Sequence, residues 1–226
     1  MNEKMRMFII CAVFALFGSC KNYVNDKASE QSLEIPKQIE QEIKKEFNGL
    51  LNILETKDLN TLDTKEIEKK IKGLKDKIEK TNAKETSLKT YLEYEKTVKE
   101  IREKLKDKLK DKKELEDKLK ELEESLKNKK EERKKALQEA KKKFEEFKGE
   151  VNSATGVTQG QRAQNQRGGG QEAWKYAKEF GLSVSFSNSA NNTSDVSNDI
   201  IDGAIKQIDE ELKNIGEEAQ NSEKKK

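Results

Sequence analysis

The chain has 226 residues and a formal net charge of +3, and 40% of it is charged whereas only 32% is hydrophobic. This composition excludes a thick globular core and is typical of thin helical bundles and coiled coils. There is no histidine, and the two cysteines, Cys11 and Cys20, lie in the first 20 residues. We therefore expect neither a disulfide framework nor a thiolate metal site in the body. Because histidine is the commonest general base and metal ligand, we also expect no enzyme activity, no metal and no cofactor.

Residues 1–19 have the pattern of a secretory signal peptide. Two basic residues precede an apolar run at 7–17, which is shorter than the roughly 20 residues of a membrane-spanning helix. The small pair Gly18-Ser19 then stands directly before Cys20, as in a bacterial lipobox. An ordinary secreted protein with an incidental cysteine at this boundary is the alternative. We expect the signal to be removed before Cys20 and this residue to carry lipid, which holds the chain on a membrane.

The segment that follows is predicted to be a flexible tether and then a helix. Residues 20–34 are polar and have no periodicity, which indicates a tether. Apolar residues then recur every three or four positions, at Ile35, Ile39, Ile43, Phe47, Leu50 and Leu54. This spacing predicts a helix over 35–55. Pro36 is expected in its first turn, because a proline has no N–H to donate inside a helix.

A second helix is predicted over 66–80, after a loop at 57–64. Asp63 and Glu66 have the spacing of a capping box at its start. The apolar residues that follow are Ile67, Ile71, Leu74 and Ile78. Their helical spacing ends at Thr81-Asn82.

The longest periodic stretch runs from about residue 85 to residue 151 and predicts a single helix of roughly 90 Å. The apolar spacing is longer than usual at 109–115 and 126–137, and Lys112 and Arg133 stand where the seam should be apolar. We interpret these irregularities as local relaxations of a supercoil. Because a lone helix of this length buries nothing, we expect the two preceding helices to fold back on it. The prediction is an all-α, elongated hairpin or bundle, and the pattern leaves monomer and dimer open.

Beyond the body, which spans 35–151, residues 152–170 are rich in Gly and Gln and are predicted to be a flexible linker. Residues 171–226 are predicted to form a small, mainly helical C-terminal part. Its elements are a short helix at 171–180 with Trp174 and Phe180, a strand-like segment at 182–186, a loop at 188–194, and a last helix capped by Ser194 or Asp195 with a frayed tail.

Charge is segregated along the chain. Residues 127–143 contain nine basic and three acidic residues, whereas residues 195–218 contain eight acidic residues and two lysines. Four lysines of the basic segment lie within about 60° of one another on a helical wheel. They are Lys127, Lys130, Lys134 and Lys141, and Arg133, Lys135 and Lys142 extend the row to its sides. Such a row predicts binding to the sulfates and carboxylates of a glycosaminoglycan.

Two simpler interpretations of this basic row remain open. Helices rich in lysine and glutamate often carry such runs as a solvated face. Alternatively, the acidic last helix docks on the basic segment and neutralises it. Anionic lipid would also be attracted to the row, whereas the secretory signal argues against a nucleic-acid partner.

Several long strings carry a resemblance to a known family. They are MFIICAVFALFGSCKNY, LNILETKDLNTLDTKEIEKKI, KDKKELEDKLKELEESLKNKKEERKKALQEAKKKFEEFKG, SATGVTQGQRA and IKQIDEELKN. Through them, nearly the whole mature chain resembles the outer surface protein F branch of the Erp (OspE/F-related) lipoproteins of Lyme-disease spirochaetes. The resemblance implies a lipoprotein exposed on the bacterial outer membrane, with a role in host adhesion. It also implies heparan sulfate binding, and for the related OspE branch binding of complement factor H, but no particular binding residues.

Two functions from different classes follow. The first is an adhesin that binds host heparan sulfate proteoglycan through the basic helix face. The second is a module that binds a host serum protein, factor H or plasminogen, with Trp174, Phe180 and the last helix as the contact. A structural surface spacer is the third interpretation.

Overall fold

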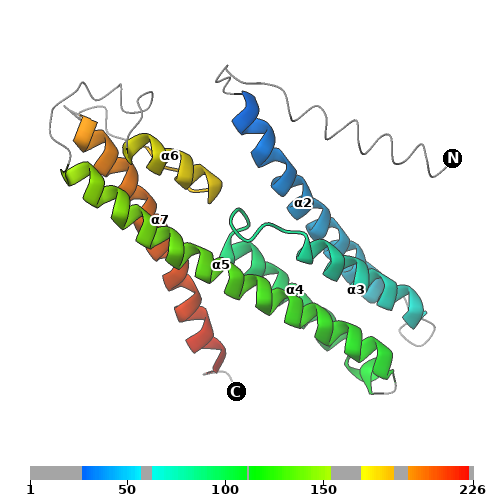
Figure 1. Cartoon of the computed structure of the whole chain (residues 1–226). Helices are drawn as coiled ribbons and strands as arrows, with labels where there is room; N and C mark the ends of the chain where they lie inside the picture. The colour runs from blue at the N-terminus through cyan, green and yellow to red at the C-terminus, as the bar shows by residue number, and fades with distance from the viewer. Residues whose placement is uncertain (1–26, 57–62, 111, 154–168, 186–192, 224–226) are drawn as a thin grey trace. The chain divides into compact units, whose positions relative to one another are not determined.

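The computed structural model describes residues 27–56, 63–110, 112–153, 169–185 and 193–223. These residues form six helices, and the chain so described contains no strand. The helices are α2 (Lys27–Thr56), α3 (Thr64–Glu79), α4 (Leu88–Leu109), α5 (Lys113–Ser153), α6 (Gly169–Glu179) and α7 (Thr193–Glu223) (Figure 1). The predicted all-α fold class is confirmed.

The chain divides into two compact units, residues 1–35 and residues 36–226. The described part of the first unit is 27–35, which begins α2. The tether predicted at 20–34 is therefore wrong for its second part, and Pro36 lies inside α2 rather than in its first turn. Residues 27–35 include Ala, Glu, Gln and Leu, which favour a helix. The units divide where Pro36 removes one backbone hydrogen bond.

The second unit contains a four-helix bundle made of α2 from Pro36 onward, α3, α4 and the first half of α5. The ion pairs that set the helix directions join Lys44 to Glu93, Lys104 to Glu55, Lys77 to Glu42, and Arg102 to Glu123. Lys44–Glu93 and Lys104–Glu55 lie at increasing residue numbers on both α2 and α4, so these two helices run parallel. The Lys77–Glu42 pair joins α3 to α2, and the Arg102–Glu123 pair joins α4 to α5; both of these helix pairs are antiparallel. The helices therefore alternate in direction along the chain, but α3 packs against α5, to which it runs parallel, rather than against α4.

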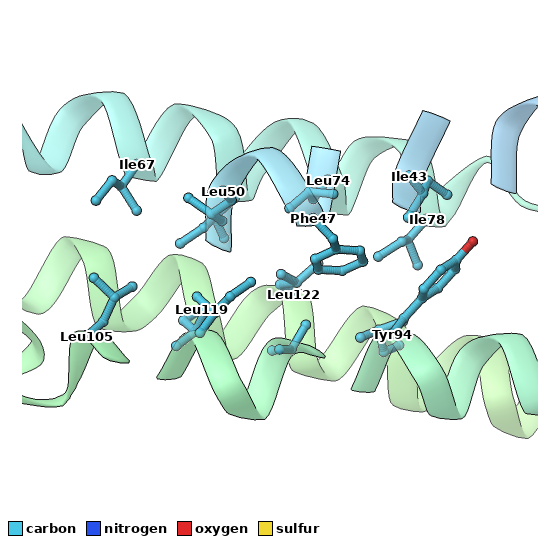
Figure 2. Close-up of a cluster of buried hydrophobic side chains, with 14 of the residues drawn as sticks. Ile43, Phe47, Leu50, Ile67, Leu74, Ile78, Tyr94, Leu105, Leu119 and Leu122 are labelled. Atoms are coloured by element: carbon cyan, nitrogen blue, oxygen red, sulfur yellow. The ribbon is translucent and has the colours of Figure 1, made fainter. Parts of the chain in front are cut away.

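The core of this bundle contains predicted apolar residues of α2 and α3 together with apolar residues of α4 and α5. Its members are Ile43, Phe47, Leu50 and Leu54 of α2, Ile67, Ile71, Leu74 and Ile78 of α3, Tyr91, Tyr94, Val98, Ile101 and Leu105 of α4, and Leu115, Leu119, Leu122 and Leu126 of α5. In Figure 2, side chains of α2 and α3 point toward those of α4 and α5. Burying a large apolar side chain contributes roughly 1.5–3 kcal/mol. This shared core therefore holds the four helices together.

The prediction of a single helix over 85–151 is wrong. α4 ends at Leu109 and α5 begins at Lys113, so the chain reverses and the two helices lie side by side (Figure 1). The step from Leu109 to Leu115 is thus a turn and not a relaxed supercoil, and Lys112 is exposed beside it. The reversal lets α4 and α5 bury their apolar stripes against each other, which a straight rod would leave in water.

The second half of α5 packs with α6 and α7 around a second core. Its members are Leu88, Leu137, Ala140, Phe144, Phe147, Ala173, Ala177, Phe180, Leu182, Val196, Ile200, Ile201, Ala204 and Ile208. Both ends of the linker predicted at 152–170 are helical, because α5 runs to Ser153 and α6 starts at Gly169. The rest of that linker lies outside the described residues.

Two features fix α6 against its neighbours. The first is a group of aromatic rings in tilted or edge contact, with centroids 5.1 to 6.2 Å apart, formed by Phe144, Phe147, Tyr176 and Phe180. The second is the close approach of Gly170 to α7. A Cβ atom at Gly170 would lie 2.1 Å from Oγ of Ser197, so only glycine lets the two helices come this near.

The strand predicted at 182–186 is wrong for its described part, 182–185, which forms no backbone ladder. The side-chain amide of Gln207 on α7 makes the two backbone hydrogen bonds to Ser183 that a neighbouring strand would otherwise make. Its Oε1 accepts a hydrogen bond from the Ser183 N–H at 3.0 Å, and its Nε2 donates one to the Ser183 carbonyl at 2.6 Å. α7 itself begins at Thr193, before both predicted capping residues, Ser194 and Asp195.

Candidate functional site

The predicted basic row lies on α5, and the structure divides its seven residues into three groups. Lys127, Lys135 and Lys142 are exposed, and no hydrogen bond or ion pair joins their side chains to another described residue. Lys130, Lys134 and Lys141 are partly buried and each is paired with a carboxylate. Arg133 is buried. The seven residues therefore do not form one continuous cationic surface.

The acidic helix α7 lies antiparallel along the second half of α5, as one of the simpler interpretations predicts. Lys141 Nζ lies 2.7 and 2.9 Å from the two carboxylate oxygens of Asp209, and Lys148 Nζ lies 2.6 Å from Asp202. The Asp209 carboxylate raises the pKa of Lys141. Partly exposed pairs of this kind stabilise a protein little, so α7 is held mainly by its buried apolar residues. Its Asp209 nevertheless neutralises Lys141 of the basic row.

Arg133 does not belong to the basic surface, because only 2% of its side chain is exposed. Its guanidinium pairs with the carboxylate of Glu211 on α7, at 2.8 Å between Nη2 and Oε2. It also donates to the backbone carbonyls of Ala83, Lys84 and Phe180. A buried charge needs such partners to offset its lost hydration. Its assignment as a polysaccharide ligand is therefore wrong in this fold.

One group of lysines lies where α4 and α5 run side by side. Lys130 Nζ lies 2.5 Å from Oε2 of Glu95, and Lys99 Nζ lies 4.0 Å from the other oxygen of that carboxylate. Lys127 lies one turn before Lys130 and has no carboxylate partner among the described residues. We call Lys99, Lys127 and Lys130, with Glu95 between two of them, the α4–α5 lysine patch.

An ion pair without net charge lies at each end of the α4–α5 lysine patch. On one side Arg102 makes two hydrogen bonds to the carboxylate of Glu123, at 2.7 and 2.8 Å. On the other side Lys134 pairs with Glu131 on the same helix at 2.7 Å. The sequence does not predict Lys99 as part of the site, because this residue lies on α4 rather than on α5. A prediction of the turn between α4 and α5 would have placed Lys99 beside the lysines of α5.

The second predicted contact surface is largely internal. Phe180 is buried in the second core. Trp174 is partly buried, and the ammonium group of Lys178 lies 3.6 Å from the centre of its ring, a cation–π contact within one helix. This leaves Trp174, but not Phe180, within reach of a protein partner.

A polar cluster lies beneath the loop between α3 and α4. Burial raises the pKa of Tyr91 and of Tyr94, and partial burial raises the pKa of Glu40. The hydroxyl groups of Tyr91 and Thr81 are 2.7 Å apart, and the Tyr94 hydroxyl donates to the backbone carbonyl of Glu40 at 3.3 Å. Both buried tyrosine hydroxyls thus have a hydrogen-bond partner, so we interpret the cluster as structural.

Cys20 and the apolar run at 7–17 lie outside the described residues, so the lipidation site stays a prediction. None of the helices in the described ranges is long and apolar enough to cross a membrane. Within the same ranges, no group of three or more His, Cys, Asp or Glu side chains is arranged to hold a metal ion.

No family model, curated protein or solved structure matches the chain. Fold and surface together define an all-α bundle protein with a lysine patch on two adjacent helices. The resemblance to the Erp lipoproteins therefore rests on the sequence strings alone.

Proposed function

We propose that the chain is a lipid-anchored bacterial surface protein of the outer surface protein F type that binds heparan sulfate through the α4–α5 lysine patch. One observation carries the site. Lys99 and Lys130 share the carboxylate of Glu95, while the exposed Lys127 beside them has no acidic partner among the described residues. The sequence resemblance and the signal pattern before Cys20 support the anchor and the location on the outer membrane.

The chemistry of the patch fits a sulfated polysaccharide. Cations on two neighbouring helices present a surface wider than a single row, and Lys99 and Lys127 are exposed to an approaching sulfate. Lys127 and Lys134 lie seven residues apart, about 10 Å along α5, so a linear chain of sulfates can continue along the helix. Lys134 would then exchange its exposed partner Glu131 for a sulfate.

Each of these contacts is expected to be weak. Salt screens exposed charges beyond about 8 Å at physiological ionic strength. Useful affinity comes from several lysines acting together and from many anchored copies that engage one polysaccharide chain. Binding should therefore fall steeply as salt is added, because released counterions no longer favour association.

The test compares two triple variants of the mature chain with Cys20→Ala, which removes the lipid acceptor. The first combines Lys99→Gln, Lys127→Gln and Lys130→Gln. The control combines Lys45→Gln, Lys69→Gln and Lys175→Gln, three exposed lysines with no ion pair among the described residues. Both lose the same charge. Three contacts of roughly 0.5 kcal/mol each correspond to about a tenfold loss of affinity for immobilised heparan sulfate in the first variant.

Equal binding by the two triple variants would refute the α4–α5 lysine patch. Binding of the parent to factor H or plasminogen, without binding to heparan sulfate, would instead favour the serum-protein module with Trp174 in its contact. The anchor is tested separately by detergent phase partitioning. Cys20→Ala should move the protein out of the detergent phase, and unchanged partitioning would contradict the lipid assignment.

A further inference from the structure

A single carboxylate on α7 reaches two other helices. Oε1 of Glu211 accepts hydrogen bonds from Arg133 Nε at 3.0 Å and from the backbone N–H of Leu88 at 2.7 Å. Oε2 accepts one from Arg133 Nη2 at 2.8 Å. Only 16% of the Glu211 side chain is exposed. Water screens charge poorly in such a place, so each of these charge-assisted hydrogen bonds is strengthened by the others.

Leu88 is the first residue of α4, and the first N–H groups of a helix have no partner within it. Ser87 caps one of them by accepting a hydrogen bond from the Thr90 N–H at 3.1 Å. Glu211 caps another, and its negative charge suits the positive end of the helix. A helix of the first bundle is thus completed by a residue that comes 123 positions later in the chain.

Arg133 connects two further segments to the same point. Its Nη1 donates to the backbone carbonyls of Ala83 and Lys84, in the loop between α3 and α4. Its Nη2 donates to the carbonyl of Phe180, at the end of α6. The Arg133–Glu211 ion pair therefore connects four segments of the chain. They are the α3–α4 loop, the start of α4, the end of α6 and the side of α7.

We propose that Arg133 and Glu211 form a latch that couples the docking of α7 to the order of the α3–α4 loop and the first turn of α4. Apolar contacts alone would let each bundle open independently. With the latch, undocking of α7 leaves the start of α4 uncapped and the Arg133 charge buried without a partner. Such coupling is reciprocal, so a ligand that stabilises the start of α4 also stabilises docked α7. The latch does not depend on the proposed function.

Amide hydrogen exchange of the mature chain tests the latch. Glu211→Gln keeps the size of the side chain but weakens its hold on Arg133 and on the Leu88 N–H. Exchange over 80–91 should accelerate by about tenfold, as expected for a loss of roughly 1.4 kcal/mol, while exchange over 98–105 in the same helix stays unchanged. The matched control is Asp209→Asn, which breaks the exposed pair with Lys141 and leaves the latch intact.

If Glu211→Gln fails to fold, a double variant keeps the proposal testable. Arg133→Met with Glu211→Leu fills the same space with apolar groups and leaves no buried charge. A folded double variant should still show fast exchange over 80–91. Wild-type protection over 80–91 in either folded variant would overturn the latch, as would equal acceleration in Asp209→Asn.

Discussion

Two helix glycines are expected to respond in opposite ways to the same substitution. Gly170 is the second residue of α6 and lies against α7, where an added Cβ would lie 2.1 Å from Oγ and 2.9 Å from Cβ of Ser197. Gly203 lies inside α7, where an added Cβ would meet nothing within 4 Å. Both substitutions replace glycine by a better helix former. The difference between them therefore measures the closeness of α6 to α7.

The magnitudes follow from these contacts. Oγ of Ser197 can rotate away, but its Cβ cannot, so Gly170→Ala forces the helices apart at a cost of about 1–3 kcal/mol. The helix gain of up to about 1 kcal/mol is smaller at a helix terminus, which leaves a net loss of about 1–2 kcal/mol. For a domain of this size that lowers the Tm by about 2–8 °C. Gly203→Ala should instead raise the Tm by about 1–4 °C, since it gains about 0.5–1 kcal/mol without a clash.

Thermal unfolding followed by circular dichroism measures both changes, and a second substitution checks the cause. Ser197→Gly removes the two closest atoms. The double variant Gly170→Ala with Ser197→Gly should therefore be more stable than the sum of the single variants predicts, by about 1 kcal/mol. A Tm that rises equally in Gly170→Ala and Gly203→Ala would refute the close packing of α6 on α7.

Two further predictions concern burial and hydrogen bonding. Burial raises the pKa of Tyr91 and Tyr94 above the usual value of 10.0. As the pH rises, these phenols therefore ionise in the unfolded chain before they ionise in the folded one. Their contribution to the free energy of unfolding is present in full below about pH 10 and falls as the pH rises further. The fall measured by denaturant unfolding should be shallower in Tyr94→Phe, and an identical pH profile would contradict burial of this phenol. Gln207→Ala removes both side-chain partners of the Ser183 backbone. Amide hydrogen exchange at 182–185 should therefore accelerate severalfold, while the buried part of α7 keeps its protection. Unchanged exchange at Ser183 would contradict the amide pairing.

The sequence predicts helices well where apolar spacing and caps agree. For α3, all four predicted apolar residues are buried, and Asp63 caps the helix by accepting a hydrogen bond from the Lys65 N–H at 3.0 Å. The reversal between α4 and α5 was missed because it contains neither glycine nor proline. Its lysines and aspartate stop no helix by themselves. Only the six-residue step between Leu109 and Leu115 marks the turn.

The candidate site was harder to predict because charge neutralisation is a tertiary property. A helical wheel places the lysines of α5 relative to one another, but it contains no information about carboxylates from other helices. Lys130 is paired by Glu95, which lies 35 positions away, and Lys141 by Asp209, which lies 68 positions away. The sequence places Arg133 at a position where an apolar residue is expected, yet its burial depends on carbonyls of two distant segments.

Chemical footprinting of lysines tests the binding site most directly. The mature chain with Cys20→Ala is acetylated briefly with and without heparan sulfate, and each modified lysine is quantified by mass spectrometry. The α4–α5 lysine patch predicts protection of Lys99, Lys127 and Lys130, which is lost at high salt, and none at Lys45 or Lys175. Protection confined to Lys142, or spread equally over all exposed lysines, would contradict the proposed site.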